Sequence, residues 1–288
     1  MGRFRRGWYE REEVSKVTLD WLKSNVRLTH REMELLQVVS ERKLVNREHL
    51  ETLVPSYRHL GENRTRLINR SIRKLFDNMC LDKIHEKQDL GKGNSPCIVA
   101  LDRGGSLLLN LSHKRRIPHH KMMVNGQAEI RRSVPLTYRH ANGINQTEVD
   151  TILFCEENGY EILEWSHEKG KAFNYNNEKI LMIPDVSIKL KIKNKTINIF
   201  LEYDTGKEGI RSKKSFPVIH EKVLNYRKYK LSKLWAEDFT YFPLVFLVTE
   251  DEHRIPYFNQ KCKEHGVQGY GIYYENYIKF LSHLAKKV

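Results

Sequence analysis

The chain has 288 residues, enough for two domains with sizeable cores, and its 50 lysines and arginines outnumber its 36 acids, giving a net charge of +14. The excess is uneven, because residues 1–135 hold 27 basic and 16 acidic side chains while residues 136–288 hold 23 and 20. This asymmetry favours a polyanionic partner for the first half. The longest apolar run, Pro243 to Val248, is too short to cross a bilayer, and no secretory signal follows the basic start of the chain. The four cysteines lack paired spacing, which argues against a zinc site and against disulfides and favours the reducing cytoplasm. Together with the short apolar runs, this leads us to expect a cytoplasmic protein without a membrane partner.

The first predicted elements are a basic arm and a leading helix, over residues 1–28. Thr29 then begins a better-defined helix, because its hydroxyl and the carboxylate of Glu32 have the spacing of a capping box. Asn46 is predicted to cap a short second helix that Pro55 ends.

The third predicted helix, from about Asn63 to Asn78, is amphipathic and strongly basic. Its apolar positions are Ile68, Ile72, Leu75 and Met79, and its basic positions are Arg64, Arg66, Arg70, Arg73 and Lys74. Two predicted strands follow, Cys80 to His85 and Cys97 to Leu101. The segment between them is rich in Gly and Asn and carries Lys87 and Lys92, which is typical of a hairpin tip.

Helix, helix, basic helix and hairpin are the order of a winged helix-turn-helix domain, which we assign to residues 29–112. In that geometry the third helix enters the major groove of duplex DNA and the hairpin tip contacts the adjacent backbone. Arginine suits both tasks, because its guanidinium pairs bidentately with guanine or with phosphate oxygens. The sequence therefore predicts that the basic residues of the helix and of the tip bind double-stranded DNA. The alternative interpretation is an ordinary amphipathic helix with a solvated basic face.

After a short predicted helix from Leu107 to Leu111, residues 113–135 lack a regular pattern and are interpreted as a basic linker. Lys114, Arg115 and Arg116 give it further capacity for phosphate contacts. The adjacent His119 and His120 are not assigned a metal, since neighbouring loop side chains rarely point at one ion.

Residues 136–288 are predicted to form the second domain. Its predicted elements are a helix capped by Asn145 or Thr147, a strand from Glu161 to His167, two strands between Leu181 and Asp204, a helix from about Pro217 to Ala236, a strand from Pro243 to Thr249, and two helices that flank a strand from Gly269 to Tyr274. The near-continuous apolar run at Pro243 to Thr249 indicates a central strand that is covered on both faces.

The stretch from Leu181 to Asp204 contains three acidic residues that are candidates for a functional site. One apolar run ends at Ile183-Pro184-Asp185, and a second leads into Glu202-Tyr203-Asp204 after a polar turn at Lys193-Asn194-Lys195. A hairpin of this kind brings Asp185 close to Glu202. Two carboxylates at adjacent strand ends are what Mg²⁺ takes from a protein. The alternative is that all three acids are solvated residues at strand ends.

These residues carry two resemblances. Pro184-Asp185, with Glu202 and a residue two positions later, resembles the PD-(D/E)XK nuclease-like superfamily, and the predicted order αβββαβ agrees with its core. The Ile-Pro-Asp and Leu-Glu-Tyr-Asp-Thr-Gly motifs, with the later Asn225-Tyr226-Arg227-Lys228-Tyr229, resemble the replication-relaxation family of Gram-positive plasmids and mobile elements. That resemblance extends from about Leu28 onward and implies an α/β chain, α+β overall, with a winged helix before a nuclease-like domain.

The superfamily resemblance implies a metal site and a catalytic lysine. The implied metal ligands are Asp185 and Glu202, with Glu148 on the first helix as a further acid. The usual lysine is replaced by Asp204, which cannot stabilise the negative charge of a transition state. Asp204 either adds a third oxygen ligand or caps the turn at Gly206. Members with a displaced lysine carry it on the following helix, where Lys222 is the candidate, and Lys213 and Lys214 are alternatives on the preceding loop.

We therefore expect a DNA-binding protein that acts in replication, transfer or transcriptional control of a plasmid or mobile element, with an inactive nuclease-like domain. DNA binding then requires no cofactor. The alternative is a Mg²⁺-dependent DNA endonuclease with a displaced lysine. A third interpretation is a protein-interaction module whose basic face meets an acidic partner. Further expected partners are a second copy of the chain or other replication and transfer proteins.

Overall fold

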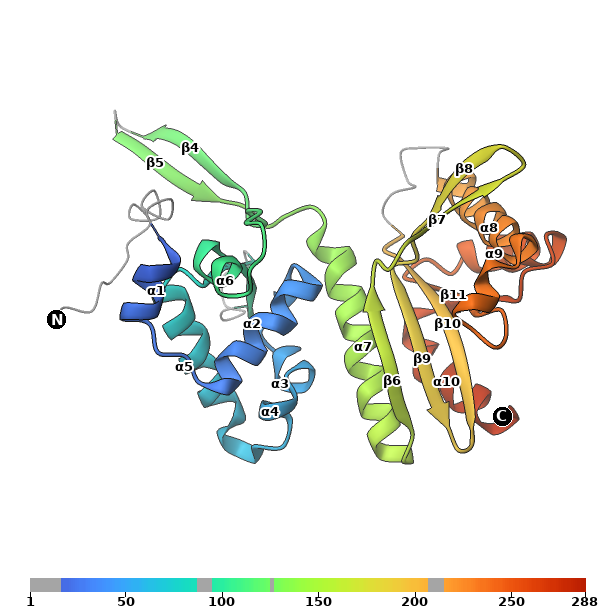
Figure 1. The fold of residues 1–288 in the computed structure, drawn as a ribbon, viewed down its shortest axis with the longest axis horizontal. Coiled ribbons are helices and arrows are strands. Elements are labelled where there is room, and N and C mark those ends of the chain that lie inside the picture. Colours follow the sequence, from blue (N-terminus) through green and yellow to red (C-terminus); the bar gives the residue numbers. More distant parts are fainter. Residues whose placement is uncertain (1–16, 87–94, 125–126, 207–214) are drawn as a thin grey trace. The chain divides into compact units, whose positions relative to one another are not determined.

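The computed structural model describes residues 17–86, 95–124, 127–206 and 215–288 (Figure 1). The chain is a mixed α/β protein with an antiparallel sheet of three strands, a mixed sheet of five strands and two separate hairpins. It divides into two compact units between Asn145 and Gln146, within the long helix α7 (Tyr138–Asn158). No described helix is both long enough and apolar enough to cross a membrane.

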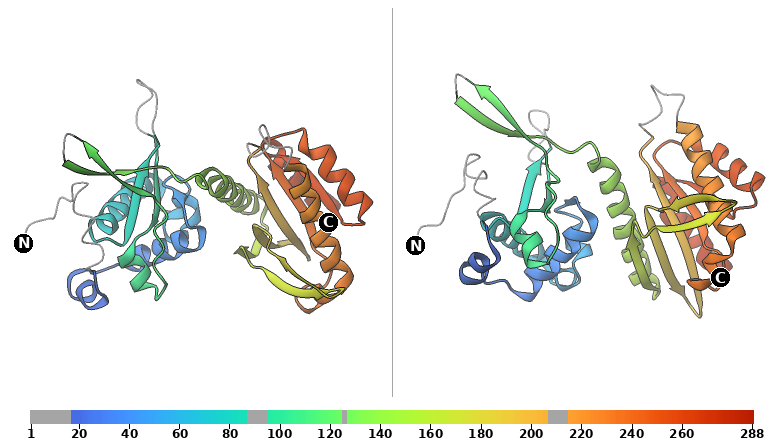
Figure 2. Two further views of the ribbon diagram at one scale, coloured as in Figure 1. Left: turned by 90° about the horizontal axis from the view of Figure 1, so that it is seen from above. Right: turned by 45° about the horizontal axis from the view of Figure 1, so that its top comes forward.

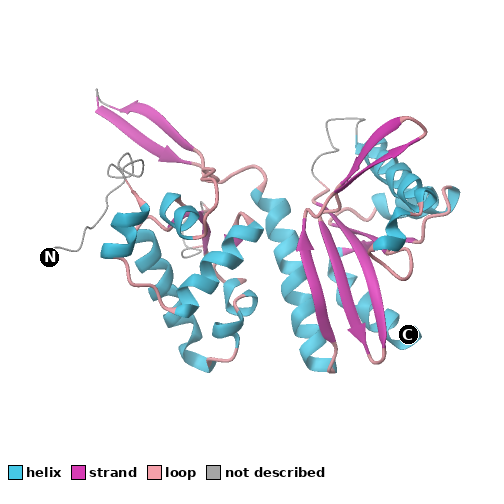
Figure 3. Cartoon of the chain, viewed as in Figure 1, coloured by secondary structure: helices cyan, strands magenta, loops and turns pink. Residues whose placement is uncertain are grey.

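Helices surround a small sheet in the first unit (Figure 3). Its elements are α1 (Leu19–Asn25), α2 (His30–Arg42), β1 (Val45–Asn46), α3 (Leu50–Leu53), α4 (Pro55–Arg58), a 3-10 turn (Gly61–Asn63), α5 (Arg64–Asp77), β2 (Leu81–His85), β3 (Cys97–Leu101), α6 (Arg103–Leu108), β4 (His119–Val124) and β5 (Gln127–Arg132). The strand order is β1-β3-β2, with β3 antiparallel to both neighbours. The predicted leading helix is seen from Leu19, and residues 1–16 lie outside the described part of the chain.

Local sequence signals explain how α2 and α5 form. Thr29 and Glu32 make the predicted capping box, with the Thr29 backbone N–H donating to the Glu32 carboxylate at 2.8 Å. α5 buries the predicted apolar face, which includes Ile68 and Leu75. The hydroxyl of Tyr57, from α4, donates to the hydroxyl of Ser71 at 2.7 Å and fixes α5 from a second side. Because these contacts fix which side chains of α5 are buried, they also fix which side chains face the solvent.

One predicted boundary of the second helix was wrong, and the other was confirmed. Asn46 does not cap the second helix, because it pairs with Ile98 as part of β1, and α3 begins only at Leu50. The predicted end of the second helix at Pro55 is confirmed, because α3 ends at Leu53 and Val54 is extended; Pro55 then begins α4, where its missing N–H is not needed.

The helix predicted from Leu107 to Leu111 is observed as α6 and starts earlier, at Arg103. It includes Gly104 and Gly105, which lie against the backbone of Asn78, Met79 and Cys80, just before β2. A Cβ on Gly105 would stand 2.3 Å from the carbonyl oxygen of Cys80, so this close approach needs glycine.

The predicted linker, residues 113–135, contains the hairpin β4–β5, in register from His119↔Arg132 to Val124↔Gln127 (Figure 2). The sequence did carry a signal, the dipeptide Asn125-Gly126, which is a strong mark of a two-residue hairpin loop. After the hairpin, α7 starts at Tyr138, earlier than predicted. Tyr138 packs in a core cluster with Leu44, Ile98, Ala100 and Ile117, and this explains why the first turns of α7 belong to the first unit.

The second unit is built on the five-stranded sheet, with strand order β12-β11-β10-β9-β6. Its elements after α7 are β6 (Glu161–His167), β7 (Lys171–Tyr175), β8 (Glu178–Met182), β9 (Val186–Ile192), β10 (Lys195–Asp204), α8 (Ser215–Ser232), a 3-10 turn (Leu234–Glu237), β11 (Leu244–Thr249), α9 (Arg254–Glu264), β12 (Gly269–Tyr273), a 3-10 turn (Tyr274–Asn276) and α10 (Tyr277–Lys287). β9 is antiparallel to β6 and β10, whereas β10, β11 and β12 are parallel. The predicted elements are present in the predicted order, and the hairpin β7–β8 was not predicted.

One core lies between β10, β11 and the helix α8. Phe200 and Leu247 from the strands pack there with Val223, Tyr226 and Tyr229 from α8. The β7–β8 hairpin closes the same core with Phe173, Ile180 and Met182. Side chains of a strand alternate between faces, so Glu202 and Asp204 lie on the same side of β10 as Phe200. This alternation aims both acids at the helices that cover that face.

Candidate functional site

The β9–β10 hairpin brings Asp185 to Glu202, as the sequence predicted. The two strands pair in register from Ile192↔Lys195 to Val186↔Leu201, so residues 185 and 202 are the next positions along. Asp185 precedes β9 rather than ending a strand. Its Oδ2 accepts the backbone N–H of Tyr203 at 2.8 Å, which ties it to the end of β10.

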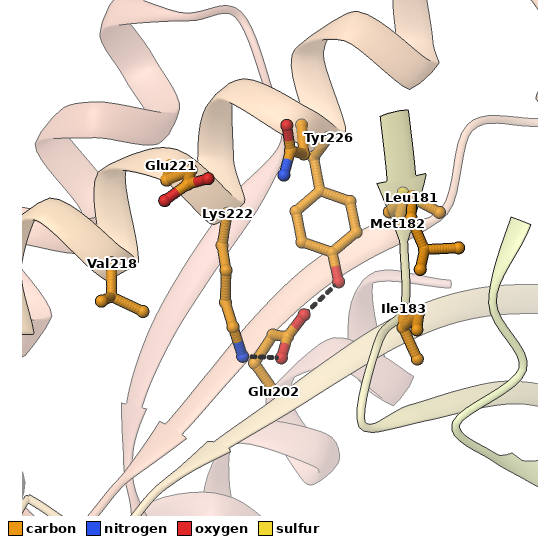
Figure 4. Close-up of a pocket in the computed structure, with 9 residues that line it drawn as sticks. Leu181, Met182, Ile183, Glu202, Val218, Glu221, Lys222 and Tyr226 are labelled. Carbon is orange, nitrogen blue, oxygen red and sulfur yellow. Dashed lines mark hydrogen bonds and ion pairs between the residues drawn. The ribbon is translucent and has the colours of Figure 1, made fainter. Parts of the chain in front are cut away.

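Glu202 is 3% exposed, and both of its carboxylate oxygens are engaged by one helix (Figure 4). Lys222 Nζ donates to Glu202 Oε2 at 2.5 Å, and the hydroxyl of Tyr226 donates to Oε1. Lys222 and Tyr226 lie four residues apart on α8, so one face of the helix presents both donors to the strand. The structure therefore brings Lys222, the candidate displaced lysine, directly to the carboxylate.

The surroundings of the buried Glu202 carboxylate strongly perturb the proton binding of this cluster. Burial, with a smaller contribution from the nearby Asp185 carboxylate, raises the pKa of Glu202 to about 7 against the opposing effect of the Lys222 ammonium. Burial lowers the pKa of Lys222, but the carboxylates of Glu202 and Asp185 outweigh this and leave it raised. Lys222 therefore stays charged at neutral pH, whereas the Glu202 carboxyl changes its charge there.

A cavity of about 250 Å³ lies beside this cluster, between α8 and the end of β8. Its charged side is the Glu202–Lys222 pair, and Asn225 adds an amide. The opposite side is apolar and exposed, with Leu181 and Ile183. Figure 4 shows Leu181, Met182 and Ile183 across the cavity from the lysine and the tyrosine.

Asp204, two positions after Glu202, is paired with neighbouring groups of the protein. Its Oδ1 accepts from Arg254 at 2.6 Å and from the backbone N–H of Gly206 at 3.2 Å, and its Oδ2 accepts from the Thr249 hydroxyl at 2.9 Å. The turn-capping role at Gly206 is thus confirmed. Arg254 was not predicted as a site residue, because an arginine fifty residues away carries no pattern that links it to this strand.

Glu148 is also buried and lies with Oε2 3.4 Å from Nε2 of His167. Within the described ranges, no group of three or more His, Cys, Asp or Glu side chains is arranged to hold a metal ion. Asp185, Glu202 and Asp204 all lie near Lys222, since each of the three carboxylates raises its pKa, and a Mg²⁺ site at these acids and Glu148 stays a prediction. The alternative lysines, Lys213 and Lys214, lie outside the described residues.

In the first unit, the basic residues predicted to bind DNA fall into two groups. Arg64 and Lys74 contact neighbouring helices and loops: Arg64 Nε lies 3.0 Å from Glu51, and Lys74 Nζ lies 2.7 Å from Glu32. Lys74 also donates to the backbone carbonyl of Arg27 at 2.6 Å. These two side chains join α5 to the rest of the unit.

Arg66, Arg70 and Arg73 form the second group and are exposed. Their spacing of four and three residues places them in one stripe along α5, which we call the arginine stripe. Arg73 has only a loose ion pair with Asp77 at 3.9 Å, and its side chain is 70% exposed. Arg66 and Arg70 have no ion-pair partner among the residues that the structure describes. Lys87 and Lys92, the other predicted DNA contacts, lie outside that set.

The sequence profile of the replication-relaxation family matches residues 36–245. This chain belongs to the replication-relaxation family. Family membership implies a role related to plasmid replication. Comparison with curated proteins and with solved structures gave no match.

The match to the replication-relaxation family covers both candidate sites. It includes the arginine stripe and all members of the Asp185, Glu202, Lys222 and Tyr226 cluster. It ends before Arg254, so the partner of Asp204 lies in the part of the chain that follows the matched region.

Proposed function

We propose that this replication-relaxation family protein binds duplex DNA through the arginine stripe of α5 and acts in the control of plasmid replication. The single observation that carries the proposal is the outward stripe of Arg66, Arg70 and Arg73, in a unit whose other α5 cations are paired. The order α2, α3, α5 and the β2–β3 pair is that of a winged helix, in which the last helix enters the major groove.

The dimensions of the arginine stripe suit the groove. Arg66 and Arg73 lie seven residues apart, which is about 10 Å along the helix axis, and a helix with its side chains is about 10–12 Å across. The major groove is about 12 Å wide and accommodates an α-helix. Exposed guanidinium groups at this spacing reach phosphates or base edges without breaking any contact that holds the unit together.

The experiment compares two triple variants with the wild type on a duplex of mixed sequence. Arg66→Ala, Arg70→Ala and Arg73→Ala together should lower the affinity on the order of 500-fold at 0.1 M salt, if each residue accounts for one phosphate contact. The matched control is Lys179→Ala, Lys195→Ala and Lys287→Ala, which removes equal charge from exposed positions of the second unit. Equal losses in the two variants would sink the proposal, since binding would then follow net charge alone.

For the second unit we propose secondary DNA contact or assembly rather than cleavage. Its order of a helix, three main strands, a helix and a further strand supports the PD-(D/E)XK-like interpretation. The internal pairing of Glu202 with Lys222 and Tyr226, and of Asp204 with Arg254, supports a closed and inactive site.

A metal-dependent endonuclease is the second candidate, because Lys222 reaches Glu202 from α8 where a displaced catalytic lysine would be needed. Plasmid, linear and single-stranded DNA are incubated with the protein and Mg²⁺ or Mn²⁺. We expect no appreciable cleavage. Nicking that needs the metal and disappears in both Asp185→Ala and Lys222→Ala would establish the endonuclease instead.

A further inference from the structure

The β4–β5 hairpin of the first unit is fixed at its base and extends away from the surrounding helices (Figures 1 and 2). At the base, the carboxylate of Asp82 is 5% exposed and accepts from His119 Nε2 at 3.0 Å and from Arg132 at 2.8 Å. Arg132 also donates to the backbone carbonyl of Lys83 at 2.6 Å. Because Asp82 and Lys83 belong to β2, one buried carboxylate joins both strands of the hairpin to the small sheet.

This base adjoins the end of the arginine stripe. Lys83 Nζ lies 4.7 Å from the ring centroid of Phe76, and the Arg132 guanidinium carbon lies 5.7 Å from the same centroid. Phe76 is three residues after Arg73 on α5, so it lies one turn further along the helix. Lys83 thus adds a partly exposed cation next to the end of the stripe, whereas the Arg132 side chain is only 9% exposed and is paired with Asp82, so it anchors the hairpin.

The β4–β5 hairpin and the segment before it, residues 113–118, are rich in basic residues, as expected for contact with DNA. Residues 113–132 hold six lysines and arginines and one glutamate. Lys114, Arg115 and Arg116 are exposed, and Met122 and Met123 on β4 are 43% and 70% exposed.

No third strand joins β4 and β5 within the part of the chain that the structure describes. An isolated two-stranded hairpin is only marginally stable in water, so such a ribbon gains by contacting a partner. The major groove admits a two-stranded ribbon as readily as a helix.

We propose that the β4–β5 hairpin is a second DNA-binding element, a β-ribbon that enters a groove of the duplex next to the α5 contact. The inference rests on the proposed duplex binding by α5 and extends it to a longer site. Charge complementarity selects DNA as the occupant, and the fixed base gives the ribbon a defined position relative to the stripe. Binding then has two parts, with the helix at the centre of the site and the ribbon on one flank.

The experiment uses the full chain and a long duplex of mixed sequence. Met122→Glu with Met123→Glu places two acids on exposed positions of the ribbon, and the control, Leu163→Glu with Tyr241→Glu, places two acids on exposed apolar positions of the second unit. We expect the ribbon variant to bind at least about tenfold more weakly at 0.1 M salt and the control to bind nearly as the wild type does.

The second readout separates the ribbon from the helix. On a duplex short enough to span only the α5 contact, the ribbon variant should bind as well as the wild type does. An equal affinity of the variant and the wild type on the long duplex would overturn the inference, while wild-type binding would still support the proposed function. Failure of the wild type to bind any duplex would overturn both. Loss of a dimer in sedimentation, with duplex affinity unchanged, would assign the ribbon to pairing between copies of the chain and also overturn the inference.

Discussion

Helices α5 and α8 both present basic side chains, but they use them in opposite ways. On α5, Arg66, Arg70 and Arg73 are exposed and point away from the core. On α8, Lys222 points to a carboxylate that is 3% exposed. The number of cations on a helix therefore does not indicate its role, and the location of the nearest acid does.

Because of this difference between α5 and α8, removing a cation has a different effect on stability in each helix. Removing an exposed arginine leaves no buried group without a partner, so the free energy of unfolding should hardly change. Removing one member of a buried pair leaves the other desolvated and unpaired, which is costly. Substitutions in the stripe should thus change binding, and substitutions of the paired residues of the second unit should change stability.

The largest effect is expected at Arg254. The side chains of Arg254 and Asp204 are 5% and 14% exposed and lie 2.6 Å apart. Arg254→Ala should lower the free energy of unfolding by about 3–5 kcal/mol, because Asp204 is left without its counter-ion. Urea denaturation followed by circular dichroism measures the loss. The double variant Arg254→Ala with Asp204→Asn should recover part of it, and a loss below about 1 kcal/mol would contradict a structural role for the pair.

The next effect depends on pH. The pKa of Glu202 rises from 4.5 to about 7 on folding, so between these values the folded chain holds a proton that the unfolded chain has released. The contribution of Glu202 to the free energy of unfolding is therefore largest below about pH 4.5, and it falls by on the order of 3 kcal/mol by pH 7. We expect the stability difference between the wild type and Glu202→Gln to shift by that amount, against the wild type, as the pH rises. A shift in favour of the wild type would mean that Lys222 lowers the pKa instead.

A smaller effect is expected from Tyr226→Phe. The substitution removes the hydroxyl that donates to Glu202 Oε1 and leaves that buried oxygen unsatisfied. The expected loss of stability is about 1–3 kcal/mol. Tyr229→Phe is the matched control, since Tyr229 is also buried on α8 and its hydroxyl makes no hydrogen bond to a described residue. Thermal unfolding curves that coincide for the two variants would show that the Tyr226 hydroxyl contributes nothing.

The features of the fold and of the sites that depend on local patterns could be predicted from the sequence. The capping box at Thr29 and the buried face of α5 follow from spacing along one helix. The meeting of Asp185 and Glu202 follows from a tight turn at Lys193 and strict pairing in a hairpin.

The features that the sequence did not indicate depend on contacts between distant elements. Arg64 is paired with Glu51 of α3, and Lys74 is paired with Glu32 of α2. These two cations of α5 are therefore not available on its exposed face. Arg254 reaches Asp204 only because α9 follows β11, the strand parallel to β10. Periodicity within a helix identifies its faces, but it cannot say which cations another element will neutralise.

The salt dependence of duplex binding tests the central claim, that the stripe cations and not the paired cations of α5 contact DNA. Affinity is measured from about 0.05 to 0.3 M salt for the wild type and for single alanine variants of Arg64, Arg66, Arg70 and Arg73. We predict that each stripe variant flattens the slope of log affinity against log salt by about 0.9, the value for one lost phosphate contact. Arg64→Ala should keep the wild-type slope and lower stability instead. Wild-type slopes in all three stripe variants would contradict the account.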